Sequence, residues 1–192
     1  MLLYIHGFNS SPLSDKGVLT RTYIEKHFPS LPFYQPQLPN CPAKAIELLC
    51  SIVERALGKG EKLRFLGSSL GGYFASYLAE KYGGKAVLIN PAVKPYELME
   101  ELLGPQFNPY TEQGFEVTQE HQVWLKDYDT PAICNPDRFY VLLQTGDEVL
   151  VYQEAVNKYH CCKMTIEAGG NHSFVGYDEK LPQICHFLEL TN

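Results

Sequence analysis

The sequence has no long hydrophobic run and no surplus of positive charge. None of its apolar stretches approaches the ~18 consecutive residues that a membrane-spanning helix needs, so no membrane span is expected. The 192 residues include 16 Lys and Arg against 22 Asp and Glu, which gives a net charge of −6 at pH 7. Because proteins bind phosphate backbones through clustered Lys and Arg side chains, we expect no nucleic acid partner.

The cysteines lack the Cys-x2-Cys spacing that is common in zinc sites. A chain of this length can bury a sizeable core without disulfide bonds. The spacing therefore favours reduced cysteines that pack as small apolar side chains, with metal binding or a catalytic thiol as the alternative. The cysteines are Cys41, Cys50, Cys134, Cys161, Cys162 and Cys185.

Length and composition both predict one domain over residues 1–192. Hydrophobic residues make up 45% of the chain and charged residues 20%, which is ordinary for a globular protein. Residues 1–7 lack the basic segment and the small-residue cleavage site of a secretory signal, which predicts a cytoplasmic protein.

Short apolar runs alternate with amphipathic stretches along the chain. This pattern predicts an α/β fold, in which helices cover both faces of a compact, mostly parallel sheet. The expected strands are residues 2–5, 33–37, 62–66, 86–89, 139–144 and 163–167, the second of them near a sheet edge because prolines bound it. The expected helices are residues 16–27, 42–57, 70–82, 152–159 and 181–190.

The most informative motif is Gly-Ser-Ser-Leu-Gly at residues 67–71, which matches G-x-S-x-G centred on Ser69. Ser68 does not fit the motif, because leucines would then occupy both glycine positions. In the nucleophile elbow of α/β-hydrolases, a sharp strand-to-helix turn holds the serine in a strained conformation, and its neighbours must lack side chains. The alternative is a glycine-rich turn without chemistry.

A serine nucleophile needs a base, an acid that orients the base, and donors for the oxyanion. In α/β-hydrolases the acid and then the histidine follow the serine in the chain, each after a strand. Asp147 follows the strand at 139–144 and His172 follows the strand at 163–167. The neighbouring Glu148 is the alternative candidate for the acid, but we expect its side chain to be a solvated surface charge. Together these positions predict a catalytic triad of Ser69, Asp147 and His172.

The loop after the first strand, His6-Gly7-Phe8, is typical of the segment that supplies one backbone N–H to an oxyanion hole. The second N–H comes from the residue after the nucleophile. We therefore expect the backbone N–H groups of Phe8 and Leu70 to form the hole. His6 itself is expected to shape the loop rather than transfer protons.

Four segments carry a resemblance to a known family: residues 4–12 (YIHGFNSSP), 67–73 (GSSLGGY), 143–149 (LQTGDEV) and 169–174 (GGNHSF). In them, and over nearly the whole chain, the sequence resembles the small bacterial esterases of the YqiA type, a compact branch of the α/β-hydrolase superfamily. The resemblance implies a serine esterase for short acyl esters, with acyl-CoA thioesters as a further substrate class. It implies no metal or organic cofactor. An acyltransferase, or a hydrolase-like protein that binds a ligand without turnover, is the alternative.

Residues 91–138 do not follow the alternation of strands and helices. They contain no convincing strand, several prolines and aromatics, and a helix-like segment around 96–103. Long insertions in compact domains are usually lids or binding loops, and this one follows the strand at 86–89, where many α/β-hydrolases carry a cap. We expect Tyr96, Leu102 and Trp124 to line an acyl pocket that limits substrates to short and medium chains. The alternative is that they only pack the insertion onto the core.

Overall fold

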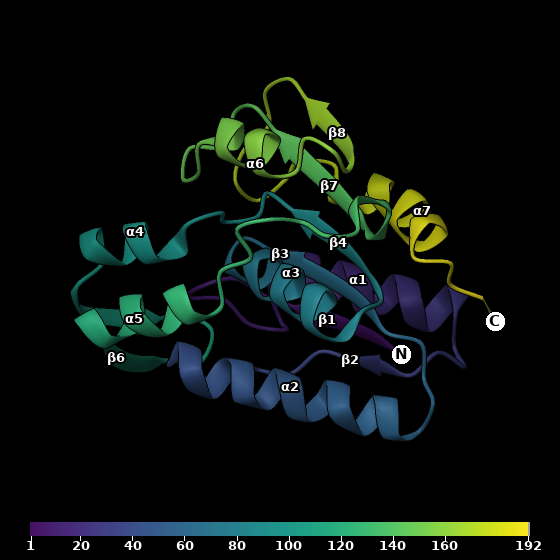
Figure 1. The fold of residues 1–192 in the computed structure, drawn as a ribbon, viewed down its shortest axis with the longest axis horizontal. Coiled ribbons are helices and arrows are strands. Elements are labelled where there is room, and N and C mark those ends of the chain that lie inside the picture. Colours follow the sequence, from purple (N-terminus) through teal and green to yellow (C-terminus); the bar gives the residue numbers. More distant parts are fainter. Residues whose placement is uncertain (192) are drawn as a thin grey trace.

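The computed structural model describes residues 1–191 and contains a six-stranded sheet in the order β2-β1-β3-β4-β7-β8. Every neighbouring pair of strands in this sheet is parallel. The strands run from β2 at the bottom to β8 at the top of Figure 1. Their bounds are β1 (Leu2–Ile5), β2 (Phe33–Tyr34), β3 (Arg64–Ser68), β4 (Lys85–Ile89), β7 (Phe139–Gln144) and β8 (Lys163–Glu167).

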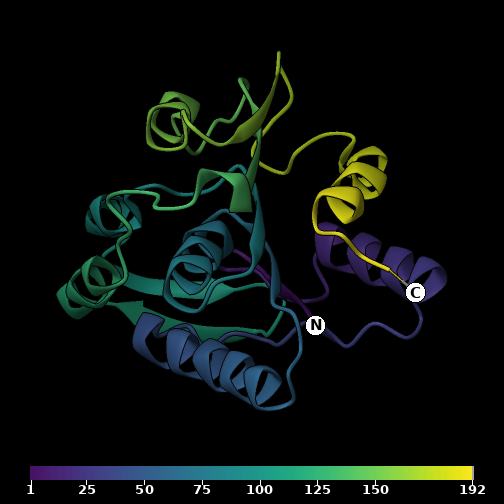
Figure 2. The same ribbon diagram turned by 45° about the vertical axis from the view of Figure 1, so that its right-hand side comes forward.

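Side chains along each central strand alternate between two apolar layers, one on each face of the sheet. In β1, Leu3 and Ile5 belong to one layer, and Leu2 and Tyr4 to the other. Helices α2 (Pro42–Gly58), α3 (Leu70–Tyr82) and α6 (Tyr152–Lys158) cover the first layer. Helices α1 (Asp15–His27) and α7 (Tyr177–Phe187) cover the second, and Figure 2 shows them together on the other side of the sheet. Burial on both faces explains why the central strands form continuous apolar runs in the sequence.

Most of the expected elements are present, with shifts at their ends. The expected edge strand at 33–37 is reduced to two residues, because it pairs only with β1 and Pro36 has no N–H to donate. The strand expected at 62–66 lies two residues later, at Arg64–Ser68, in register with β1 from Leu2 onward. The last helix begins at Tyr177, earlier than expected, and contains Pro182.

The prediction that residues 91–138 contain no strand is wrong. β5 (Gly104–Asn108) and β6 (Gln113–Val117) form an antiparallel hairpin between α4 (Pro95–Glu101) and α5 (Gln119–Asp127). Both strands are polar and half-exposed, so the short apolar run that marks a buried strand is missing. α5 contacts α4 and α2, which places the insertion at one end of the first layer (Figure 1).

None of the helices within residues 1–191 is both long and apolar enough to cross a membrane.

Candidate active site

Ser69 occupies a strained turn between β3 and α3, at the carboxyl edge of the sheet. Its backbone has φ 55° and ψ −122°, a conformation that residues other than glycine rarely adopt. A Cβ atom at Gly67 would overlap the carbonyl group of Gly71, and one at Gly71 would overlap the carbonyl group of Ile5. Both glycines of the G-x-S-x-G motif are therefore required by close backbone packing around the serine.

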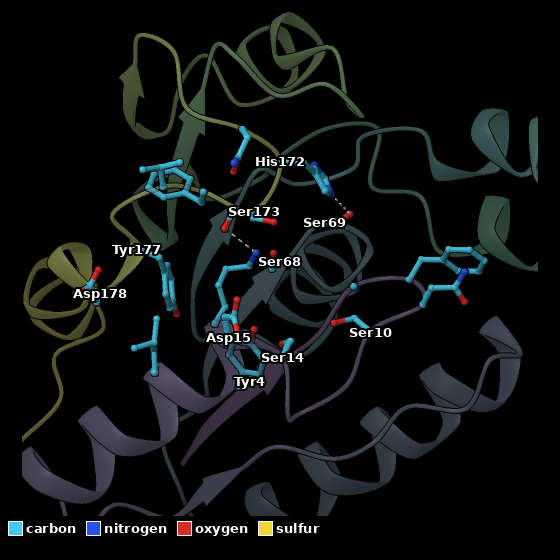
Figure 3. A pocket seen from close by; sticks show the side chains of 18 of the residues that line it. Tyr4, Ser10, Ser14, Asp15, Ser68, Ser69, His172, Ser173, Tyr177 and Asp178 are labelled. Carbon is cyan, nitrogen blue, oxygen red and sulfur yellow. Dashed lines mark hydrogen bonds between the residues drawn. The ribbon is translucent and has the colours of Figure 1, made fainter. Parts of the chain in front are cut away.

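Three side chains predicted from the sequence meet at this turn. Oγ of Ser69 lies 3.0 Å from Nε2 of His172, and Nδ1 of His172 lies 2.9 Å and 2.8 Å from the two carboxylate oxygens of Asp147. They come from the turns after β3, β8 and β7, whose carboxyl ends share one edge of the sheet. The Asp147 side chain is 2% exposed and that of His172 is 22% exposed. Figure 3 shows His172 reaching over Ser69 at one side of a hollow.

Asp147 is held in place by its own turn. Its Oδ1 accepts hydrogen bonds from the backbone N–H groups of Val149 and Leu150, both at 2.9 Å. Burial by itself would raise the pKa of Asp147, but the hydrogen bonds from His172, Leu150 and Val149 outweigh it and lower the pKa. Asp147 is therefore ionised at neutral pH, and a carboxylate facing Nδ1 keeps the imidazole proton on that nitrogen.

The loop that carries His172 is fastened to the sheet by two buried amides that the sequence reasoning missed. Nδ2 of Asn90 donates to the carbonyl oxygens of Asn171 and His172, at 3.0 Å and 3.2 Å. Oε1 of Gln144 accepts the N–H groups of Asn171 and Val175, and its Nε2 donates to the carbonyl of Val175. The signal available in the sequence was a polar amide directly at the end of an apolar strand, at both β4 and β7.

Two charged side chains hold the same loop from outside. Oε2 of Glu148 accepts the N–H of His172 at 2.9 Å, and this bond lowers the pKa of Glu148. Nζ of Lys16 donates to the carbonyl oxygen of Ser173 at 2.9 Å. Glu148 is exposed, as expected of a surface charge, but it also anchors the backbone of His172. Asp147 therefore binds the imidazole of His172, whereas Glu148 binds the main-chain N–H of the same residue.

The two expected oxyanion donors belong to the residue after the serine and to the loop after β1. Leu70 is the first residue of α3, so its N–H has no partner within the helix. Gly7 brings the loop after β1 close to the serine: a Cβ at Gly7 would lie 3.1 Å from Cβ of Ser69. Among residues 1–191, the N–H groups of Phe8 and Leu70 donate to no other protein group. Both donors are therefore available to a bound oxyanion.

The loop after β1 is held by hydrogen bonds of His6, at its own start, and of Asn108, in the insertion. His6 is buried, and burial lowers its pKa. Its Nε2 accepts the N–H of Leu38 at 3.0 Å, so Nδ1 carries the proton and donates to the carbonyl of Gly7 at 2.9 Å. From the hairpin, Nδ2 of the buried Asn108 donates to the carbonyl of Ser10 at 3.1 Å. His6 therefore shapes the loop, as expected.

A cavity of about 390 Å³ opens beside Ser69. Its wall is formed by the loop after β1, the start of α1 and the segment after His172 (Figure 3). Of the insertion, only Tyr110, at the turn of the β5–β6 hairpin, reaches it. The cavity lies on the side of the sheet that α1 and α7 cover.

The expectation that Tyr96, Leu102 and Trp124 line this cavity is corrected by the structure. Tyr96 and Leu102 pack against the apolar layer on the other face of the sheet, and the hydroxyl of Tyr96 donates to Asp129 at 3.2 Å. The ring of Trp124 packs beside His121, with centroids 5.3 Å apart. α4 and α5 sit over that opposite layer, and none of their residues lines this cavity.

The parallel sheet, the strained serine between β3 and α3, and the loops after β7 and β8 define an α/β-hydrolase fold. Similar solved structures have the same fold: alpha/beta hydrolase domain-containing protein 10 from mouse has a TM-score of 0.68 at 16% identity, covering 98% of this chain and 88% of the other. The Pyrococcus furiosus esterase PF2001 has a TM-score of 0.69 at 13% identity, covering 98% and 80%. Est1E from Butyrivibrio proteoclasticus, solved with ferulic acid bound, has a TM-score of 0.67 at 16% identity, covering 98% and 88%.

The chain belongs to the family UPF0227, described as an uncharacterised protein family, which matches residues 1–189. A UPF0227 protein of Yersinia pseudotuberculosis is 28% identical over 194 residues, with 99% of each chain covered. The match confirms the resemblance to the YqiA type.

Proposed function

We propose that this chain is a serine hydrolase that cleaves carboxylic esters through an acyl-enzyme on Ser69. The observation that carries the proposal is the unbroken chain of hydrogen bonds from Ser69 through His172 to Asp147, at 3.0 Å and 2.8 Å. A serine hydroxyl is a weak nucleophile at neutral pH until a neighbouring base takes its proton. The likeness of the fold to a protein named as an esterase supports an ester as the bond that is cleaved.

In the first half of the reaction, Nε2 of His172 takes the proton of Ser69 as Oγ bonds to the carbonyl carbon. The carbonyl oxygen becomes an oxyanion that faces the N–H groups of Phe8 and Leu70. The bond to the leaving alkoxide then breaks, and His172 gives that alkoxide its proton. Throughout, Asp147 accepts the hydrogen bond from Nδ1 and stabilises the imidazolium.

In the second half, water replaces the alcohol. His172 takes a proton from the water as its oxygen attacks the acyl carbon, and the proton returns to Oγ of Ser69 when the acyl bond breaks. A thioester reacts by the same steps with a thiolate as the leaving group. The cavity of about 390 Å³ lies at the small end of the range for small-molecule sites, which favours short- to medium-chain substrates.

The test is covalent labelling combined with ester hydrolysis. A fluorophosphonate probe should modify the wild type at Ser69, located by mass spectrometry of the peptide, and should leave Ser69→Ala unlabelled and inactive. The neighbouring Ser68→Ala variant should still be labelled, since Ser68 is a buried residue at the end of β3 and it is Ser69 that is hydrogen-bonded to His172. Labelling at Ser68, or turnover by Ser69→Ala, would refute the proposal. Adding an alcohol and measuring the ester that forms separates hydrolysis from acyl transfer.

A further inference from the structure

The wall of the cavity beside Ser69 is polar and apolar in about equal parts. Serine, tyrosine and asparagine side chains outnumber aliphatic ones around it, and Asp15, Lys16 and Asp178 line it together with His172. A purely aliphatic acyl chain placed there would strip water from these groups without replacing their hydrogen bonds. The cavity therefore suits a substrate with polar or charged groups of its own.

Lys16 is the one lysine or arginine among the described residues that line the cavity. It is half-buried, and burial lowers its pKa while Asp15 and Asp147 act to raise it. Its ammonium makes a single hydrogen bond, to the carbonyl oxygen of Ser173, and has two further N–H donors. Across residues 1–191, no carboxylate lies within 4.0 Å of it.

A second partly buried lysine differs from Lys16 in having an ion-pair partner. Burial also lowers the pKa of Lys158, but Lys158 has Asp129 as an ion-pair partner at 3.3 Å. A half-buried ammonium without such a partner is costly, and groups of this kind concentrate at functional sites. Among the described residues, Lys16 is thus a cation that has lost part of its water and has no carboxylate within ion-pair distance.

The acidic side chains of the cavity do not fill that role. Asp15 and Asp178 are both exposed, so water screens their charge more than that of Lys16. In Figure 3 Asp178 lies on α7, on the far side of the cavity from Ser69. An anion bound near Ser173 would therefore interact with the ammonium of Lys16 more strongly than with these two carboxylates.

We propose that Lys16 binds a carboxylate or phosphate group carried by the substrate, so that this site acts on esters or thioesters of small anionic molecules. The inference rests on the proposed hydrolase function. Lys16 and Ser69 line the same cavity, and Ser173, whose carbonyl binds the ammonium, follows His172 directly in the chain. An anionic group held by Lys16 and the scissile carbonyl can therefore belong to one small molecule.

The experiment compares esters of equal length with and without an added charge. p-Nitrophenyl butyrate and p-nitrophenyl hemisuccinate share a four-carbon acyl group, and only the second carries a carboxylate. Phenyl butyrate and 4-phosphophenyl butyrate place a phosphate on the leaving group instead. For at least one pair, the wild type should prefer the charged ester in kcat/KM by about 10-fold or more, as a hydrogen bond to a charged group allows. The pair that shows the preference identifies carboxylate or phosphate.

The variants separate recognition from loop support. Lys16→Met should abolish the preference, chiefly through KM, while Lys16→Arg should retain most of it. Lys26→Met is the matched control, since Lys26 lies exposed on the same helix and outside the cavity. No preference in either pair, or equal losses for charged and neutral esters in Lys16→Met, would overturn the inference; equal losses would leave Lys16 as a support for the Ser173 loop.

A binding measurement keeps the inference distinct from the proposed function. Calorimetry with monomethyl succinate and with phenyl phosphate on the Ser69→Ala variant requires no turnover. Binding that disappears when Lys16→Met is added supports the anion site even if no ester is hydrolysed. Hydrolysis of neutral esters without any such binding would uphold the hydrolase and refute the anion site.

Discussion

Replacing Asp147 with asparagine should disable the site by forcing His172 into the wrong tautomer. Oδ1 of Asp147 accepts the N–H groups of Val149 and Leu150, both at 2.9 Å. An asparagine must keep its carbonyl oxygen on those two donors, because its NH2 group there would face N–H groups. Its NH2 then replaces Oδ2, the oxygen nearer to Nδ1 of His172 at 2.8 Å, while Oδ1 at 2.9 Å is shared with the two N–H groups. Facing an NH2 group, Nδ1 is favoured as an acceptor over a donor. The ring proton moves to Nε2, the nitrogen that should take the proton of Ser69.

The size of the effect follows from the cost of the other amide orientation and from the same substitution in serine proteases. Turning the amide round would leave two backbone donors unpaired, at about 1–3 kcal/mol each, so the harmful orientation prevails. The same substitution in serine proteases lowers kcat by about 10⁴, or ~5.5 kcal/mol of transition-state stabilisation. We expect a loss of that order in kcat for Asp147→Asn. KM should change little, since Asp147 does not line the cavity beside Ser69.

The assay is steady-state hydrolysis of a neutral p-nitrophenyl ester, with urea unfolding to verify the fold. The matched control is Glu148→Gln, whose amide oxygen can still accept the N–H of His172. Because Glu148 is exposed, the activity of the Glu148→Gln variant should stay within about threefold of the wild type. If Glu148→Gln loses more activity than Asp147→Asn, the assignment of the acid is wrong. Retention of more than about a tenth of the activity by Asp147→Asn would refute the tautomer argument.

Two further predictions concern the scaffold of the site. Gln144→Met should lower kcat by about 10- to 100-fold with little change in KM, because the loop that positions His172 loses three hydrogen bonds; the exposed Gln153→Met is the control, and a change in KM alone would contradict it. Gly71→Ala should lower the free energy of unfolding by at least ~2 kcal/mol, because its Cβ overlaps the carbonyl of Ile5. Gly58→Ala, which meets nothing within 4 Å, should be neutral or stabilising by up to ~1 kcal/mol in urea unfolding. Equal effects of the two glycine changes would refute the packing argument.

The predictable part of the site depended on local motifs and on one rule of topology. The backbone strain at Ser69 is a property of the segment 67–71, and the two glycines of its G-x-S-x-G motif predict it. Asp147 and His172 follow strands, and the carboxyl ends of parallel strands share one edge of the sheet, so their meeting could be expected without a structure. The buried strand β7 was predicted at the residues that form it, because both of its faces are apolar.

The parts that could not be predicted depend on contacts between distant segments. The β5–β6 hairpin is half-exposed and polar, so its strands have no apolar periodicity to reveal them. The place of the cavity depends on how α1 approaches the loop after β8, a contact between residues 157 positions apart in the pair Lys16 and Ser173. Sequence reasoning therefore assigned the pocket to the insertion, which was the conspicuous segment, and overlooked the start of α1.

Asn90 and Gln144 show why such a loop can be rigid. Each stands where an apolar strand ends, and each is buried, at 2% and 3% exposure. A buried amide must find hydrogen-bond partners, because leaving its polar atoms unpaired costs about 1–3 kcal/mol per group. The partners are main-chain groups of the loop that carries His172, Glu167 at the end of the adjacent strand β8, and the N–H of Gln144, which donates to Oδ1 of Asn90. The hydrogen bonds that these two buried amides must make thus fix the position of the His172 loop. Lys16, in contrast, makes one hydrogen bond and keeps two N–H donors for a ligand.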